Sequence, residues 1–466
     1  MLQHPHKSLE SACPRLARLV GLVFLALATL ASAGSELPAL GENSLFNIER
    51  ETRLGRSVYD RLLESGLVES HPLLDRYIND LGLRLLAGID NQVRDYRFFI
   101  VRDDSINAFA LPGGFIGVNR GLIMQARTQH QLASVLAHEI AHVRLMHGME
   151  MMKKGSELNT RAILTMLAGL LLGGVDSQVG SAVLVGSIAG TEQAFVNFTR
   201  ENEYEADRVG MELLSQARFD PNGMVEFFGI MSKLSGSSEI GNIEYMRTHP
   251  VSNNRIAEAI DRAQNLGSGA NQVDDYLLFK DYLLYSSNDY LPRQGSEFMR
   301  ALASIKAADY GTADNQLTAL YERDNENIWY SIAFAENLEL LGRESEAELV
   351  YRRLLDIFPG DYVLSMRLLR LLKLEDRHQS ALVLARSLEN DFPEDKQVYF
   401  ELSEIYQALQ RPALRLMAEA EFHRINGNSL QAIKLYEQVL NSADTDLVTE
   451  SEAREKQSIL KKQQQQ

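Results

Sequence analysis

The chain has 466 residues, of which 47 are basic and 63 acidic, so its net charge is −16 at neutral pH. This acidic balance argues against a nucleic-acid-binding protein and against adhesion to anionic lipid by charge alone. The length predicts two or three domains, and a hydrophobic content of 45% is sufficient for packed cores.

The first 33 residues have the pattern of a secretory signal peptide. Basic residues precede an apolar run, Leu19–Leu30, and Ala31-Ser32-Ala33 fits a signal-peptidase site. The run is shorter than the roughly 20 residues needed to span a bilayer, which argues against a membrane anchor. The only cysteine, Cys13, precedes the run and is not placed for lipid attachment. We therefore predict cleavage after Ala33 and a mature chain without disulfides, with 44 basic and 62 acidic residues and a net charge of −18.

The segments that follow predict a small α+β domain. Residues 46–65 and 71–87 have the periodicity of amphipathic helices. Residues 95–101 (DYRFFIV) predict a strand. Residues 108–118 predict a second strand or a hairpin, with Pro112-Gly113-Gly114 as a kink or turn.

An H-E-x-x-H sequence, His138-Glu139-Ile140-Ala141-His142, lies in a segment predicted to be helical from Thr128 to Gly148. Thr128 and Gln131 form a capping-box pattern. Residues four apart share a helix face, so both imidazoles can bind one ion, and imidazoles are good zinc ligands. Glu139 lies one step round the helix, where it meets a water molecule rather than the metal. The pattern predicts a zinc peptidase; the alternative is a surface helix with these residues by chance.

Two histidines leave the predicted zinc site incomplete, because a catalytic zinc usually has three protein ligands. The metzincin spacing is absent, since Leu145 and Gly148 stand where that class has Gly and His. His147 lies off the face shared by the two motif histidines. We interpret it as a helix C-terminal residue, favoured there by the helix dipole, and not as a ligand.

An acidic ligand from a later helix is the remaining option, and residues 200–210 supply it. Glu203 and Asp207 lie four apart and share a face. Glu203 is predicted to bind the metal, and Asp207 to support a ligand histidine from behind. Glu201 and Glu205 are predicted to be solvated.

Residues 162–190 contain two apolar arms, 162–175 and 179–190, separated by three polar residues. Each arm is too short to cross a bilayer, and six glycines permit close helix packing. We predict a helical pair packed on the catalytic domain. The alternative is a segment that dips into the membrane, and an exposed part would give peripheral membrane contact.

The C-terminal part carries an internal repeat of 34 residues, the period of tetratricopeptide repeats. Ala313, Ala347 and Ala381 recur at this period, and Ala432 follows 51 residues later, so an extra helix is predicted near 412–422. Stacked helix pairs of this kind usually bind peptides or proteins, whereas a generic helical bundle is the alternative. Residues 265–271 (NLGSGAN) predict a hinge before the repeats.

These motifs together resemble those of the HtpX-type gluzincin zinc metallopeptidases. The resemblance covers nearly the whole mature chain, and its motifs are Asn107–Gly114 (NAFALPGG), HEIAH, Glu203-x-x-x-Asp207, Thr248-His249-Pro250 and Arg255. It implies an α+β zincin-like metallopeptidase domain followed by an all-α tetratricopeptide-repeat solenoid. It also implies one Zn²⁺ per chain held by His138, His142 and Glu203, with Glu139 as the catalytic base.

The resulting domain prediction is a signal peptide at 1–33, a metallopeptidase domain at 34–268 and a repeat domain at 269–466, with repeats at roughly 297–460. Within the family, the chain is most similar to periplasmic members with a secretion signal and a repeat tail. Similarity to such members implies that the protein is an endopeptidase that takes part in the assembly and quality control of outer-membrane β-barrel proteins. Its partners would be misfolded or stalled β-barrels and the β-barrel assembly machinery. The alternative is a repeat-based chaperone whose proteolysis is secondary or latent.

The resemblance leaves two roles open for His249, which matches the family's His-Pro motif. In one role it is a fourth zinc ligand that restrains activity until a substrate arrives. In the other it is a hydrogen-bond donor that positions the scissile carbonyl or stabilises its oxyanion.

Overall fold

The computed structural model describes residues 48–89, 94–154, 192–235, 245–269, 275–287 and 295–464. The predicted signal peptide and the apolar segment 162–190 lie outside these residues, so membrane contact through that segment stays a prediction. The chain divides into two compact units, Met1–Tyr276 and Leu277–Gln466. Within the described ranges, no helix is long and apolar enough to cross a membrane.

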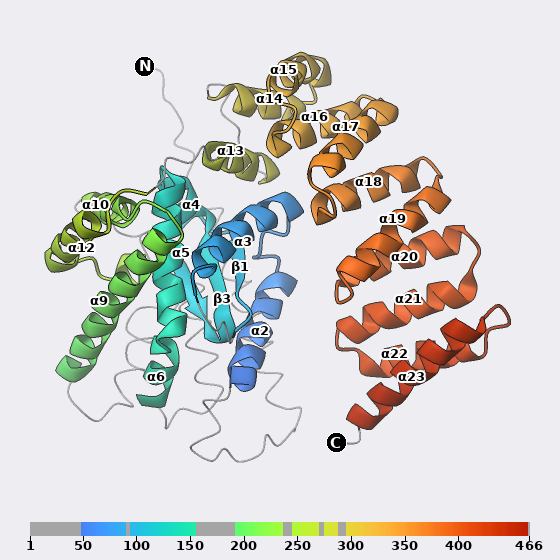
Figure 1. The fold of residues 1–466 in the computed structure, drawn as a ribbon, viewed down its shortest axis with the longest axis horizontal. Helices are drawn as coiled ribbons and strands as arrows, with labels where there is room; N and C mark the ends of the chain where they lie inside the picture. Colours follow the sequence, from blue (N-terminus) through green and yellow to red (C-terminus); the bar gives the residue numbers. More distant parts are fainter. Residues whose placement is uncertain are drawn as a thin grey trace, which may run out of the picture. The chain divides into compact units, whose positions relative to one another are not determined.

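The first unit contains a three-stranded sheet of order β1-β3-β2 (Figure 1). β1 (Arg97–Val101) pairs in parallel with β3 (Phe115–Asn119), and β2 (Ala108–Leu111) pairs antiparallel with β3. The short 3-10 turn η1 (Pro112–Gly114) joins β2 to β3. Gly113 has a φ of 79° in this turn, which glycine adopts without a steric cost. The hairpin predicted as one alternative for 108–118 is thus the observed structure.

Two helices cover opposite faces of β1, because successive strand residues point to opposite sides. α2 (Ile48–Glu64) places the Tyr59 ring 5.0 Å from the Phe99 ring, centroid to centroid. α3 (Pro72–Leu86) packs on the other face, where a Cβ at Gly82 would lie 2.2 Å from the Phe98 ring. The apolar cluster under α2 comprises Val58, Tyr59, Leu62, Val68, Phe99, Val101, Leu111 and Phe115.

The centre of the first unit is one buried helix, α5 (Gln129–Arg144), which packs against β2, α9 and α10. The bounds of the other helices are α4 Arg120–Gln125, α6 His147–Lys154, α9 Glu192–Gln216, α10 Asn222–Ser235, α11 Tyr245–Thr248 and α12 Asn253–Leu266. α9 approaches α5 closely because Gly210 has no side chain: a Cβ there would lie 3.2 Å from the backbone nitrogen of His138. This close approach brings the acidic residues of α9 to the histidines of α5.

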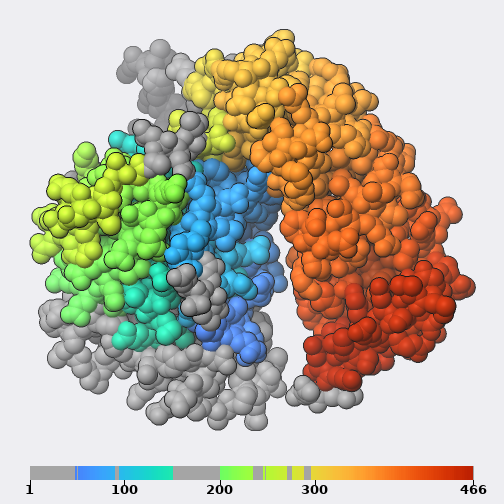
Figure 2. All heavy atoms as spheres, viewed as in Figure 1, coloured from blue at the N-terminus to red at the C-terminus, as the bar shows by residue number. Residues whose placement is uncertain are grey.

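The second unit is a series of paired helices (Figure 1), and its surface runs from yellow to red along the chain in Figure 2. In four of these pairs, the turn that joins the two helices contains a residue with a left-handed backbone. These residues lie 34 positions apart: Ala308, Gly342, Asp376 and Gln410. The repeated alanines, Ala313, Ala347, Ala381 and Ala432, are fully buried. The extra helix predicted near 412–422 is α21.

The helices from the end of the first unit onward have the following bounds: α13 Tyr276–Ser286, α14 Glu297–Lys306, α15 Tyr310–Arg323, α16 Ile328–Leu340, α17 Glu344–Ile357, α18 Tyr362–Leu374, α19 His378–Asp391, α20 Lys396–Ala408, α21 Pro412–Ile425, α22 Ser429–Leu440 and α23 Leu447–Gln463.

Candidate metal centre

Helix α5 carries the H-E-x-x-H sequence through the interior of the first unit. Its N-terminus is capped as the sequence predicts, since Thr128 Oγ1 accepts the backbone N–H of Gln131 at 3.3 Å. The side chains of His138 and His142 are 2% and 13% exposed, and their Nε2 atoms lie 3.0 Å apart. The i, i+4 spacing therefore brings both imidazoles to one point.

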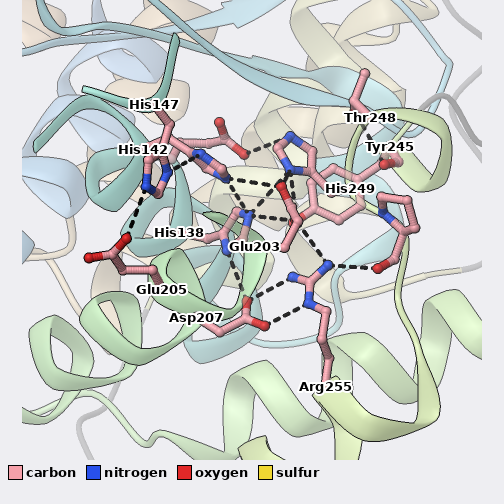
Figure 3. Close-up of polar contacts among 12 residues, drawn as sticks. His138, His142, His147, Glu203, Glu205, Asp207, Tyr245, Thr248, His249 and Arg255 are labelled. Atoms are coloured by element: carbon pink, nitrogen blue, oxygen red, sulfur yellow. Dashed lines mark hydrogen bonds and ion pairs between the residues drawn. The ribbon is translucent and has the colours of Figure 1, made fainter. Parts of the chain in front are cut away.

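Helix α9 brings two carboxylates to these histidines (Figure 3). Glu203 Oε2 lies 3.5 Å from Nε2 of His138, and Glu203 Oε1 lies 3.4 Å from Nε2 of His142. Asp207, one turn later, approaches from behind: its Oδ1 lies 3.0 Å from Nδ1 of His138. The two acids therefore meet opposite nitrogens of the same imidazole.

A fourth group comes from the residue after α11. His249 Nδ1 lies 3.0 Å from Glu203 Oε1 and 3.3 Å from Nε2 of His138. The His249 ring lies over the ring of Tyr245 at a centroid distance of 4.8 Å, and its backbone N–H donates to the Tyr245 carbonyl at 2.7 Å. The Tyr245 N–H in turn donates to the carbonyl of Ile106, just before β2. Tyr245 thus fixes the His249 ring, a role that the sequence analysis missed because an aromatic residue four positions earlier is no distinct signal.

One donor atom from each of His138, His142, Glu203 and His249 lies within 4.8 Å of the other three. Three imidazole nitrogens and a carboxylate oxygen converge on one small, buried volume, where their lone pairs need a cation or protons between them. Nitrogen and oxygen donors in this number are the donors that zinc takes in proteins. The residues present therefore fit a metal ion.

Burial and hydrogen bonding shift the pKa values of the site in opposite directions. Burial opposes a charge on His138, but its contacts with Asp207 and Glu203 outweigh burial and raise the pKa of His138 to about 10. Burial lowers the pKa of His142 to about 4. Burial alone would raise the pKa of Glu203, yet attraction to His249 and hydrogen bonds from the imidazoles hold this pKa well below its usual range. Glu203 is therefore a carboxylate at neutral pH, the form that binds a metal.

Arg255 of α12 connects both acids to the loop that carries His249. Its Nε and Nη2 atoms donate to the two oxygens of Asp207 at 2.6 and 2.8 Å. Its Nη1 atom lies 2.9 Å from Glu203 Oε2 and donates to the carbonyl of Pro250 at 2.8 Å. The guanidinium is 3% exposed and holds Asp207 in the bidentate geometry that suits a carboxylate. Burial opposes ionisation of Asp207, but the hydrogen bonds from Arg255 and His138 lower its pKa.

Glu139, the acid within the H-E-x-x-H sequence, lies beside these groups and not among them. Its side chain is 2% exposed, and Oε1 lies 3.5 Å from Nε2 of His249. No hydrogen-bond partner for this oxygen exists in the part of the chain that the structure describes. A buried carboxylate oxygen without a partner is an available proton acceptor.

His147 differs from the sequence prediction, which placed it in the last turn of one helix ending at Gly148. Instead α5 ends at Arg144 and His147 begins α6, because Met146 between them has a left-handed backbone with φ of 57°. His147 is buried, its Nδ1 lies 3.0 Å from Nδ1 of His142, and burial lowers its pKa. A glycine would have signalled this break, but the left-handed residue is a methionine.

The buried site between two helices, beside a small sheet, is that of a metallopeptidase. Residues 72–263, which include β1 to β3 and all four clustered groups, match Peptidase family M48, which identifies this region as a peptidase domain of that family.

The similarity to known proteins extends beyond the peptidase unit. The chain is 29% identical to the beta-barrel assembly-enhancing protease of Escherichia coli (strain K12) over 435 residues, which cover 87% of each chain. It is 27% identical to a putative beta-barrel assembly-enhancing protease of Vibrio cholerae, over 86% of this chain and 87% of that one. The mitochondrial metalloendopeptidase OMA1 of Schizosaccharomyces pombe is 29% identical over 45% of this chain and 60% of its own length. The likeness to the first two therefore includes the paired helices.

Proposed function

We propose that this protein is a periplasmic zinc endopeptidase that assists the assembly of outer-membrane β-barrel proteins and degrades misfolded or stalled ones. The observation that carries the proposal is the buried His138, His142, Glu203 and His249 cluster with Glu139 beside it. Similarity to beta-barrel assembly-enhancing proteases over 87% of the chain supports the client class. The predicted signal peptide supports the periplasmic location.

In this proposal His138, His142 and Glu203 hold one Zn²⁺ per chain. When bound, zinc supplies a Lewis acid that polarises the scissile carbonyl and acidifies water. The carboxylate of Asp207, 3.0 Å from Nδ1 of His138, favours the tautomer with its proton on Nδ1, which leaves Nε2 free for the metal. Arg255 keeps Asp207 ionised and fixes it for this task.

Glu139 is the general base. Its Oε1 accepts a proton from the attacking water and passes it to the leaving amine as the peptide bond breaks. No hydrogen bond within the described residues has to be broken before this oxygen accepts a proton. Because the side chain is buried, the low local dielectric strengthens the attraction between the Glu139 carboxylate and the positive charge that develops on the attacking water.

The domain organisation proposed is a zincin-like peptidase domain at 34–268 and a tetratricopeptide-repeat domain at 269–466. The repeat domain would dock misfolded or stalled β-barrel clients and the β-barrel assembly machinery. Exposed apolar side chains recur at equivalent positions of successive pairs: Leu349 and Val383, 34 residues apart, are 68% and 69% exposed. Exposed apolar groups at a repeated position favour protein binding. They also favour the second candidate function, a chaperone whose proteolysis is secondary.

Metal removal tests the proposal and separates the two functions. Purified protein is treated with a zinc chelator and then mixed with a misfolded outer-membrane β-barrel protein. We expect cleavage of this client to stop and to return on addition of one equivalent of Zn²⁺, because the ligands are otherwise intact. Persistent cleavage without metal would contradict the zinc mechanism. Suppression of client aggregation by the metal-free protein would show the chaperone function in isolation.

We further propose that His249 is the fourth zinc ligand, because its Nδ1 lies within 3.0–3.3 Å of Glu203 and His138. A fourth protein ligand closes a tetrahedral site that catalysis needs open. His249→Ala is therefore expected to raise basal cleavage of a flexible peptide and self-cleavage, with zinc retained by the other three ligands. His130→Ala, on the first turn of α5, is the matched control and should leave cleavage unchanged.

The donor role of His249 predicts the opposite sign. If His249 stabilises the oxyanion, His249→Ala should lower turnover by roughly 10²–10³-fold, as loss of an oxyanion donor does in other hydrolases. Lower turnover with full zinc content would therefore refute the fourth-ligand proposal.

A further inference from the structure

The ring nitrogens that face away from the cluster have partners of different kinds. Nδ1 of His138 faces the carboxylate of Asp207 at 3.0 Å. Nδ1 of His142 faces no acid and instead lies 3.0 Å from Nδ1 of His147 (Figure 3). His147 therefore lies behind His142, on the side away from the four clustered donor atoms, and cannot itself join the cluster.

A continuous helix could not make this contact. Five residues advance an α-helix by about 140° beyond one full turn, so His147 would point away from His142. The break after Arg144 changes its direction, and the left-handed backbone of Met146 produces the break. A left-handed backbone is strained in a residue other than glycine, so the surrounding structure must hold this conformation in place.

The proton positions follow from the contact. His142 presents Nε2 to the cluster, so a metal bound there leaves the proton on Nδ1. That N–H donates to Nδ1 of His147, which must then be unprotonated. The proton of His147 accordingly lies on Nε2, which is 3.4 Å from Oε2 of Glu205. The three side chains thus form a directed chain that runs from the cluster to a carboxylate whose side chain is 56% exposed.

We propose that His147 is a positioning residue for the zinc ligand His142, and that Glu205 fixes the tautomer of His147. The inference rests on the proposed zinc site and gives His142 the support that Asp207 gives His138. It also gives Glu205, which the sequence analysis treated as a solvated residue, a defined partner. Partners of this kind hold a ligand imidazole in its orientation and tautomer, and their loss typically weakens metal binding.

The test measures zinc affinity by competition with a chelator in the full-length protein. His147→Leu removes the acceptor, and we expect the zinc dissociation constant to rise by about 10–100-fold. His147→Asn places an amide oxygen near the position of Nδ1, so we expect it to restore most of the affinity. His130→Leu is the matched control: it removes an imidazole from α5, the helix that carries His142, at a position where Nδ1 accepts the backbone N–H of Asp220 at 3.2 Å. It should leave zinc affinity unchanged.

Equal zinc affinity in wild type and His147→Leu would overturn the inference while the proposed function stands. Absence of zinc binding in the wild type would instead refute the proposed function. Should His147→Leu fail to fold, nitrogen-15 NMR of the zinc-loaded wild type decides the matter. We expect a hydrogen-bonded Nδ1 proton on His142 and an Nε2 proton on His147. A proton on Nδ1 of His147 would contradict the inference.

Discussion

Glu139→Gln is expected to lower peptide hydrolysis by about 10²–10⁴-fold while zinc content stays at the wild-type level. The amide has nearly the same volume as the carboxylate but cannot accept the proton of the attacking water. The side chain is 2% exposed, and its Oε1 has no hydrogen-bond partner among the residues described, so packing around it should not change. Zinc is retained because Glu139 is not one of the four clustered donors.

The matched control for this variant is Glu201→Gln. Glu201 lies exposed on α9, two residues before Glu203. Its replacement by Gln removes one negative charge close to the site, as Glu139→Gln does. We expect its hydrolysis rate to equal that of the wild type. Hydrolysis by Glu139→Gln at the wild-type rate would show that another group is the base.

Arg255→Met is expected to destabilise the first unit by about 3–5 kcal/mol, because it leaves Asp207 and Glu203 as buried carboxylates without their cation. The variant also loses the hydrogen bond to the Pro250 carbonyl and so frees the loop that carries His249. We therefore expect weaker zinc binding as well. Hydrogen exchange at α5 and α9 measures the effect locally. The single tryptophan, Trp329, lies in the second unit, so its fluorescence reports that unit and should not change.

Arg208→Met provides the comparison for Arg255→Met. Arg208 also joins α9 to α12, through a 2.6 Å contact with Glu258, but its side chain is 50% exposed. Exposed ion pairs typically contribute about 0.2–1 kcal/mol, so this variant should have a small effect. Equal effects of the two variants would contradict the view that Arg255 is the cation on which the acids of the site depend.

Local spacing explains why much of the site was predictable. His138 and His142 share a face because both lie in one helix, and Glu203 and Asp207 do so for the same reason. The 34-residue period likewise predicted the paired helices, and the 51-residue interval from Ala381 to Ala432 predicted the additional α21. The shared faces follow from the regular geometry of one helix, and the repeat follows from the fixed length of one helix pair.

The remaining features depend on contacts between distant segments, for which a single sequence gives no register. The sequence did not reveal that Tyr245 holds the His249 ring, or that β1 pairs in parallel with β3. It also predicted an unbroken helix to Gly148, because the residue that breaks it, Met146, has no special turn propensity. His147 was consequently assigned to the wrong position.

The central claim is that three imidazoles and one carboxylate bind a single zinc ion, and X-ray absorption spectroscopy of the zinc-loaded protein tests it most directly. The only cysteine of the sequence, Cys13, lies in the predicted signal peptide, so only nitrogen and oxygen neighbours should appear. We predict one zinc per chain with scattering from three imidazole rings in the wild type and from two in His249→Ala. Two rings in both proteins, or a zinc content well below one per chain, would contradict the account.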